Sequence, residues 1–219
     1  MKKIKFKLKT HHPKVNNVKV HFKLQKVVEK KILINKVNKL ENYTVKRHNN
    51  YFVVRHKQNK AVYSIFPDSL FINLTGIKNF KQIHKYIDQF NADFEEEIRL
   101  TEVFIDNSTS AGKFYFEKKG AKIENIFINL EELKFLVDNH VLFQHMRFSL
   151  SPANFPGAVI RIKGWPTTLI FNSGCFTIVG GRSEQKIKET FSEICFCVRT
   201  WINTFSETRK LFATIASAE

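Results

Sequence analysis

The sequence predicts an α+β protein made of two similar halves, and three observations support this fold class. The composition is typical of a folded globular protein, because 43% of the 219 residues are hydrophobic and 26% charged, with only eight Gly and five Pro. Segments with two-residue alternation and segments with helical spacing follow one another in the same order twice. The turns that separate them recur at a nearly constant distance. Each half is therefore expected to contain a strand, a helix, three or more antiparallel strands and a second helix.

The best-defined strands lie in residues 50–80 and 154–184. In both segments an aromatic residue opens a strand of branched residues, a second strand ends in Ile-Phe, a hairpin turn follows, and a third strand closes on glycine. The equivalent positions are 103 to 105 residues apart, and they are Phe52 and Phe155, Phe66 and Phe171, and Gly76 and Gly180.

Each half is expected to begin with a short strand that carries a central Asn. These residues are Asn17 in residues 15–20 and Asn125 in residues 123–128. Amphipathic helices are predicted after both strands, over about 24–40 and 130–143. Helical spacing of apolar residues predicts two further helices, which cover 83–90 and 187–198 and end the two halves.

These elements divide the chain into four segments. Residues 1–10 form a basic strand or arm, 11–92 the first repeat, 93–121 an elaborated connection, and 122–219 the second repeat with a C-terminal helix. The connection contains an acidic run at 95–97 and a polar run at 107–112, and it has room for one more strand at 113–117.

The whole excess of positive charge lies in the first part of the chain. The net charge is +16, and residues 1–60 hold eighteen Lys and Arg against two acidic residues, whereas residues 61–219 hold eighteen of each. Nucleic acid is the commonest polyanionic partner of such a block, and a solvated face is the alternative. Lysines alternate with apolar residues over 3–9, which predicts a strand with one cationic face.

Several function classes are not expected. There is no run of eighteen apolar residues for a membrane span, and the N-terminus lacks the apolar stretch of a signal peptide. The three cysteines lack CxxC spacing and are expected to be reduced, and no phosphate-binding loop, HExxH zinc motif or GxSxG nucleophile turn is present. The sequence therefore predicts no enzyme, no metal site and no cofactor.

Three segments resemble the TATA-box-binding protein family: FPGAVIRI at 155–162, PTTLIFNSG at 166–174 and GGRSE at 180–184. Residues 122–125 resemble the opening strand of the family's second repeat. The resemblance covers the chain in outline and residues 122–199 in detail. It implies a pseudo-twofold saddle of curved antiparallel sheet with helices on the convex face.

The resemblance also implies a DNA-binding site. Members of the family insert two pairs of phenylalanines into the minor groove, place an Asn from each repeat against the central base pairs, and contact phosphates with basic residues. The matching positions here are Phe52, Phe66, Phe155, Phe171, Asn17, Asn125, Arg55, Lys78, Arg161 and Arg182. Because Phe accounts for 22 residues, a role in the core is the alternative for each single ring.

The function expected from these features is promoter recognition in transcription initiation, by binding and bending A/T-rich double-stranded DNA. RNA polymerase initiation factors are the expected protein partners, in the nucleus or, for a viral protein, at a cytoplasmic replication site. Residues 151–154 are uncharged where the family carries acidic residues for its B-type initiation factor. The alternatives are a saddle-fold protein-interaction scaffold and an RNA-binding sheet.

Overall fold

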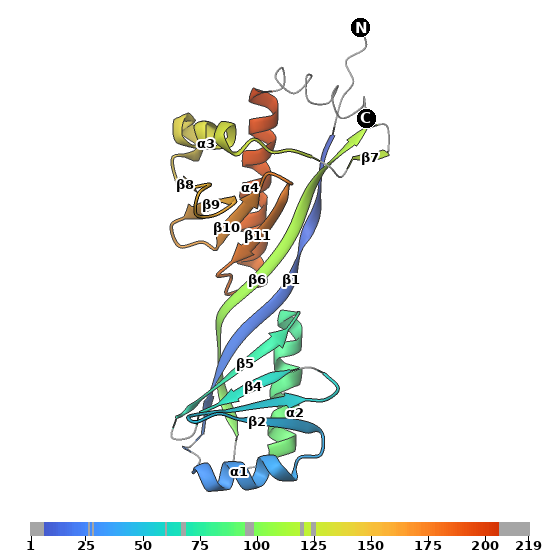
Figure 1. The fold of residues 1–219 in the computed structure, drawn as a ribbon, viewed down its shortest axis with the longest axis vertical. Helices are drawn as coiled ribbons and strands as arrows, with labels where there is room; N and C mark the ends of the chain where they lie inside the picture. Colours follow the sequence, from blue (N-terminus) through green and yellow to red (C-terminus); the bar gives the residue numbers. More distant parts are fainter. Residues whose placement is uncertain are drawn as a thin grey trace. The chain divides into compact units, whose positions relative to one another are not determined.

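The computed structural model describes residues 7–25, 27, 29–59, 61–66, 69–94, 99–118, 121–123 and 126–205, and Figure 1 shows the order of their elements. The strands are β1 (Lys7–Leu24), β2 (Tyr43–Arg47), β3 (Phe52–His56), β4 (Val62–Ile65), β5 (Phe71–Ile77), β6 (Leu100–Lys118), β7 (Ala121–Ile123), β8 (Met146–Leu150), β9 (Gly157–Ile162), β10 (Thr167–Phe171) and β11 (Cys175–Val179). The helices are α1 (Lys30–Lys39), α2 (Ile83–Phe94), α3 (Leu130–Asn139) and α4 (Glu184–Thr204), with 3-10 turns η1 (Phe80–Gln82) and η2 (Val141–Phe143).

The chain folds into two compact units. The first-repeat unit comprises residues 15–109 with 182–184, and the second-repeat unit comprises residues 1–14, 110–181 and 185–219. Strands β1 and β6 contribute to both units. The strand order is β2-β3-β4-β5-β1-β6 in the first and β8-β9-β10-β11-β6-β1 in the second, so the two units repeat one arrangement. This repetition confirms the α+β fold class with two similar halves.

The core of the first-repeat unit lies between one face of its strands and the helices α1 and α2. Alternate residues of β1, namely Val18, Val20 and Phe22, are fully buried there. Helix α2 contributes Phe90 and Phe94, whose rings stack with centroids 4.1 Å apart. The opposite face of the strands carries the remaining alternate side chains. We call the strand face opposite the helices the open face of a unit.

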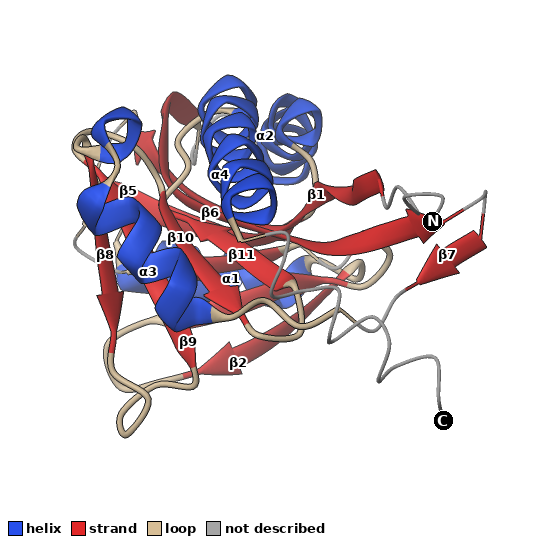
Figure 2. Ribbon diagram, turned by 90° about the horizontal axis from the view of Figure 1, so that it is seen from above, coloured by secondary structure: helices blue, strands red, loops and turns tan. Residues whose placement is uncertain are grey.

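The second-repeat unit buries its strands against α3 and α4. In Figures 1 and 2 helix α4 lies along β10 and β11. The ring of Phe176 on β11 contacts Phe114 on β6 and stacks on Phe191 of α4, with centroid distances of 5.0 and 5.5 Å. Trp201 on α4 donates a hydrogen bond of 3.0 Å to Glu132 on α3, which joins the two helices.

Strand β6 is the main difference from the sequence-based expectation. Residues 100–118 form a continuous strand that takes a central place in the sheet, although 93–121 was expected to be a connection. Small residues let this polar run lie inside the fold. A Cβ at Gly112 would meet the Phe176 ring and lie 2.8 Å from the His11 carbonyl oxygen, while Ser108 and Ser110 are buried. Residues 126–128, expected to belong to a strand, have no regular structure.

The basic arm is part of β1 where the structure describes it. Residues 7–10 are strand, as the alternation predicted, and residues 1–6 lie outside the described part of the chain. Helix α1 begins at Lys30, later than the expected start near residue 24, because β1 extends through Leu24. Among the described residues, no helix is both long enough and apolar enough to cross a membrane.

Candidate nucleic-acid interface

The open face of the second-repeat unit is largely apolar. The register of β9, β10 and β11 aligns Val159 with Leu169 and Leu169 with Thr177 across the three strands. These side chains are half-buried, and they alternate with buried neighbours such as Ile160 and Ile170. A surface of this kind offers shape and apolar contact, with few hydrogen-bonding groups.

An aromatic pair lies at one end of this face. The rings of Phe155 and Phe171 are 5.6 Å apart at an angle of 57°, and both side chains are half-buried. Phe171 pairs with Gly157 across β9 and β10, and a Cβ at Gly157 would lie 2.9 Å from the Phe171 ring. The glycine therefore leaves the space that this ring occupies. The structure brings together the two residues that the sequence predicted as a pair.

The first-repeat unit has an equivalent aromatic pair, but one of its residues differs from the expectation. Tyr51 stacks on Phe66, with centroids 5.3 Å apart, and His48 stacks on the other side of Tyr51 at 4.4 Å. Phe52 was expected on this surface, and that expectation is wrong because the side chain is 3% exposed and belongs to the core. Phe52 pairs with Ile65 across β3 and β4, and both side chains are buried. Because successive residues of a strand face opposite sides, Tyr51 before Phe52 and Phe66 after Ile65 face outward.

Of the two asparagines expected to contact DNA, Asn17 lies in β1. Asn17 accepts a hydrogen bond of 2.9 Å from the backbone N–H of Gly76. Asn125 lies outside the described residues. The counterpart of Asn17 in the structure is Asn107 on β6, an exposed residue with contacts of its own.

The local burial pattern supports this equivalence. In β1, Val15 packs against the core and Val18 is buried, three residues later. In β6, Ile105 packs against the core and Ser108 is buried, again three residues later. Inward-facing residues of a regular strand are two positions apart, and a spacing of three means that one extra residue interrupts the alternation. The interruption falls at the same place in β1 and β6. The repeat distance of this element is therefore 90 residues, and a search at 103 to 108 residues misses it.

The four expected basic residues all have exposed side chains. Arg55 is on β3 and Arg161 is on β9, where it pairs with Arg147 of β8. Lys78 follows β5 and Arg182 follows β11. Within the described part of the chain none of these four makes an ion pair. Their charges are therefore available to phosphate groups.

The glycines near the ends of β5 and β11 have the same backbone conformation. Gly76 and Gly180 adopt φ values of 84° and 87°, in the left-handed region that favours glycine. As expected, Gly180 directly follows β11, whereas β5 extends one residue past Gly76 to Ile77.

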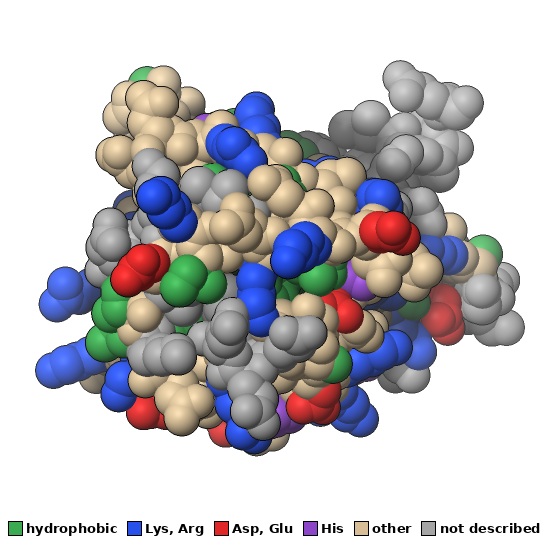
Figure 3. Space-filling model, turned by 90° about the horizontal axis from the view of Figure 1, so that it is seen from below, with side chains coloured by type: hydrophobic (Ala, Val, Ile, Leu, Met, Phe, Trp, Pro, Cys, Tyr) green, Lys and Arg blue, Asp and Glu red, His purple; other side chains and the backbone are tan. Residues whose placement is uncertain are grey.

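The lysines of β1 are in part neutralised by β6. Lys19 lies 3.4 Å from Asp106 and Lys23 lies 3.2 Å from Glu102. In the second-repeat unit, Lys9 lies 3.7 Å from Glu117. Figure 3 shows Lys and Arg side chains spread over the face that it views, with acidic side chains among them. Three lysines of β1 thus have an acidic partner on β6.

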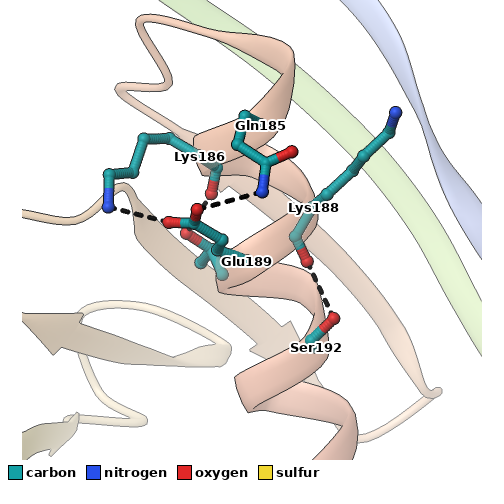
Figure 4. Close-up of polar contacts among 6 residues, drawn as sticks. Gln185, Lys186, Lys188, Glu189 and Ser192 are labelled. Atoms are coloured by element: carbon teal, nitrogen blue, oxygen red, sulfur yellow. Dashed lines mark hydrogen bonds and ion pairs between the residues drawn. The ribbon is translucent and has the colours of Figure 1, made fainter.

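Helix α4 begins with a solvated polar network, which Figure 4 shows in detail. Lys186 and Gln185 donate hydrogen bonds of 2.7 and 3.1 Å to Glu189, and these bonds lower the pKa of its carboxyl group. The Lys186 ammonium also lies 4.6 Å from the centre of the Trp165 ring. The last of these contacts connects the helix to the loop between β9 and β10.

The described residues hold no cluster of three or more His, Cys, Asp or Glu side chains that could bind a metal ion. Cys175 is exposed, whereas Cys195 and Cys197 are buried on α4, and all three thiols are free.

The comparisons with known proteins agree with this arrangement. Residues 121–200 match the family described as transcription factor TFIID, or TATA-binding protein (TBP). Among solved structures, TBP of Methanococcus jannaschii matches with a TM-score of 0.62 and 23% identity over 87% of this chain and 99% of that chain. No curated protein matches the sequence. The chain is therefore a TBP-like protein, with the fold of TBP and the family's sequence pattern in residues 121–200.

Proposed function

We propose that this protein is a DNA-binding transcription factor that recognises promoters through the minor groove of A/T-rich duplex DNA and bends it. The observation that carries the proposal is the Phe155–Phe171 pair, which lies at one end of an apolar open face. The exposed Arg161 lies on β9, four residues along the strand from Gly157, which pairs with Phe171. The likeness to TBP in sequence and fold supports the same class of function and gives no indication of an enzyme.

The aromatic pairs would act as wedges. A half-buried ring at the end of a strand is held by its neighbours, and one face of it stays available to a base step. Insertion of such a ring unstacks the step at a cost of a few kcal/mol, which the added contact area offsets. In the first-repeat unit Tyr51 and Phe66 take this role, with Tyr51 in place of Phe52.

Base selection in the second-repeat unit would come from its apolar face. An A·T pair presents only acceptors in the minor groove, whereas a G·C pair adds the amino group of guanine. Val159 and Leu169 cannot accept a hydrogen bond from that amino group, so a G·C pair would leave a buried donor without a partner. Arg161, Arg55, Lys78 and Arg182 would contact phosphates on the flanks.

The proposal includes initiation factors of RNA polymerase as partners, in the nucleus or, for a viral protein, at a cytoplasmic replication site. The B-type factor would have to bind without acidic residues at 151–154, where Ser151 accepts backbone hydrogen bonds from Asn154 and Phe155 that close an uncharged turn.

The decisive experiment compares two duplexes of equal length, one with a TATA-type sequence and one G·C-rich, at the same salt concentration. Affinity is measured by fluorescence anisotropy and bending by energy transfer between the duplex ends. We expect at least about tenfold tighter binding and a bend with the TATA-type duplex. Equal affinities without bending would overturn the proposal.

One observation favours a second candidate, a protein-interaction scaffold. Four large apolar side chains of the second-repeat unit are 45–68% exposed on α3, η2 and α4: Phe135, Val141, Leu142 and Phe196. The ring of Phe196 lies 5.6 Å from that of the buried Phe143 on η2. Exposed apolar groups of this size mark protein-binding surfaces. The scaffold would be the main function if the two duplexes bind equally.

A further inference from the structure

The open face of the first-repeat unit carries a carboxylate between two cationic or proton-donating partners. Asp106 on β6 contacts His21 on β1, with 2.5 Å between Oδ1 and Nδ1. Its other oxygen, Oδ2, lies 3.4 Å from the Lys19 ammonium. All three residues belong to the first-repeat unit, and Lys19 and His21 alternate along β1 with the buried Val18, Val20 and Phe22. The cluster therefore faces away from the core.

Aromatic rings hold this cluster in place. The His21 ring stacks on Phe104 with centroids 4.7 Å apart and meets Phe71 edge-on at 5.4 Å. Phe71 and Phe104 are themselves 43% and 40% exposed, so the His21 ring is held at the surface. The Asp106 side chain is 28% exposed. Because its imidazole partner is fixed on both sides, the carboxylate has a defined position on the surface.

The carboxylate retains capacity to accept hydrogen bonds. Two carboxylate oxygens offer about four lone-pair sites, and His21 and Lys19 together use about two of them. The Lys19 ammonium also offsets the negative charge, which lessens repulsion by DNA phosphates. The equivalent position in β1, 90 residues earlier, is Asn16, so only one of the two repeats places an acid here.

We propose that Asp106 accepts a hydrogen bond from the amino group of guanine in the minor groove, so that the first-repeat unit takes a G·C pair at one position. This inference rests on the proposed function. Guanine N2 is the single donor that a base pair presents in the minor groove, whereas an A·T pair presents acceptors that a carboxylate repels. The two units then differ in preference, with A·T pairs on the apolar face of the second and one G·C pair at Asp106.

The test replaces single A·T pairs of an A/T-rich site with G·C and, in a matched series, with inosine·cytosine, which lacks the amino group. At one position we expect wild-type protein to bind the G·C duplex about tenfold more tightly than the inosine duplex. Asp106→Ala should lose this difference, while its affinity for the inosine duplex stays within about threefold of that of the wild type. Glu102→Ala is the matched control, because Glu102 lies on the same strand and also pairs with a lysine. It should keep the difference.

Two outcomes would overturn the inference: equal binding of G·C and inosine duplexes by wild type at every position, or a preference for G·C that survives in Asp106→Ala. The comparison within the wild-type protein does not depend on the folding of any variant. Failure of the proposed function looks different, because wild-type protein would then show no preference for the parent A/T-rich site over a G·C-rich duplex, and the inference would fall with it.

Discussion

The ring of Tyr51 stacks on that of Phe66, with their centroids 5.3 Å apart, whereas the adjacent Phe52 is buried in the core of the first-repeat unit. The two neighbours therefore have opposite roles, one at the surface and one in the core. The unfolding free energies of Ala variants at the two positions are therefore enough to distinguish the two roles.

We expect Phe52→Ala to lower the free energy of unfolding by about 3–5 kcal/mol, because it leaves a cavity among buried side chains. Tyr51→Ala should cost less than about 1 kcal/mol, since its ring is half-buried. Urea unfolding followed by circular dichroism measures both. A larger loss for Tyr51→Ala than for Phe52→Ala would contradict the assignment.

Phe171→Ala should abolish most of the DNA bend while changing the unfolding free energy by less than about 1.5 kcal/mol, because the ring is only half-buried. Energy transfer between labelled duplex ends measures the bend. The control is Phe176→Ala on the neighbouring strand, whose ring is 1% exposed, and which should lose about 3–5 kcal/mol of stability. A bend that persists in a folded Phe171→Ala protein would show that the pair is not a wedge.

Asn17→Asp should keep the fold and lose preference for A/T-rich DNA. The carboxylate still accepts the hydrogen bond from Gly76, so we expect a stability change of less than about 1 kcal/mol. It lacks the amide donors that can bind adenine N3 or thymine O2. The affinity ratio between TATA-type and G·C-rich duplexes measures the effect, and Asn16→Asp on the adjacent exposed residue is the control. An unchanged ratio in Asn17→Asp would exclude base contact by this residue.

Removal of residues 1–6 should make DNA binding less dependent on salt. The deletion removes Lys2, Lys3 and Lys5 and leaves β1 intact from Lys7. If all three contact phosphate, the slope of log affinity against log salt becomes shallower by about 2.7, at about 0.9 per contact. Titrations at four or more salt concentrations give the slope. The same slope in both proteins would place these lysines outside the interface.

Only one of the three thiols should react in the folded protein. Burial raises the pKa of Cys195 to about 11 and that of Cys197 to about 12, and it also blocks access, whereas Cys175 is exposed. At pH 8 we expect one equivalent to react rapidly with a thiol reagent in buffer and three in denaturant. Cys175→Ser should remove the rapid phase, and rapid reaction of two or more thiols in the native state would refute the burial of α4.

The sequence predicts best those elements in which alternation and turn chemistry agree. In β9, β10 and β11 the alternating residues, the glycine at position 174 and the closing Gly180 all specify the same hairpins, and the strands fall where expected. The candidate pair Phe155 and Phe171 belongs to this part of the chain, which explains why the structure brings both rings together.

Two expectations failed because the deciding contacts are distant in sequence. The run Asn107–Gly112 is polar and small, which indicates a loop on local grounds, but the Phe176 ring needs the space that Gly112 leaves in β6. Phe52 is the first residue of β3 and Tyr51 directly precedes it, and both are aromatic. Which of the two side chains faces the core depends on the pairing of Phe52 with Ile65. A shift of one residue in this register exchanges core and surface, and no local pattern determines it.

The division of β1 and β6 between the two units has a consequence for folding during synthesis. Residues 15–109 leave the ribosome before residues 110–118 of β6, which hold the partners of Lys9 and His11, so most of the first-repeat unit is available while that end of β1 has no neighbour. At 5–20 residues per second the nine residues 110–118 take roughly 0.5–2 s to appear. An unpaired strand edge invites association between nascent chains, and lysines are a common protection against it. Lys7, Lys9 and Lys14 lie in this end of β1, so we expect these lysines to lessen such association until residues 110–118 appear, independent of any contact with DNA.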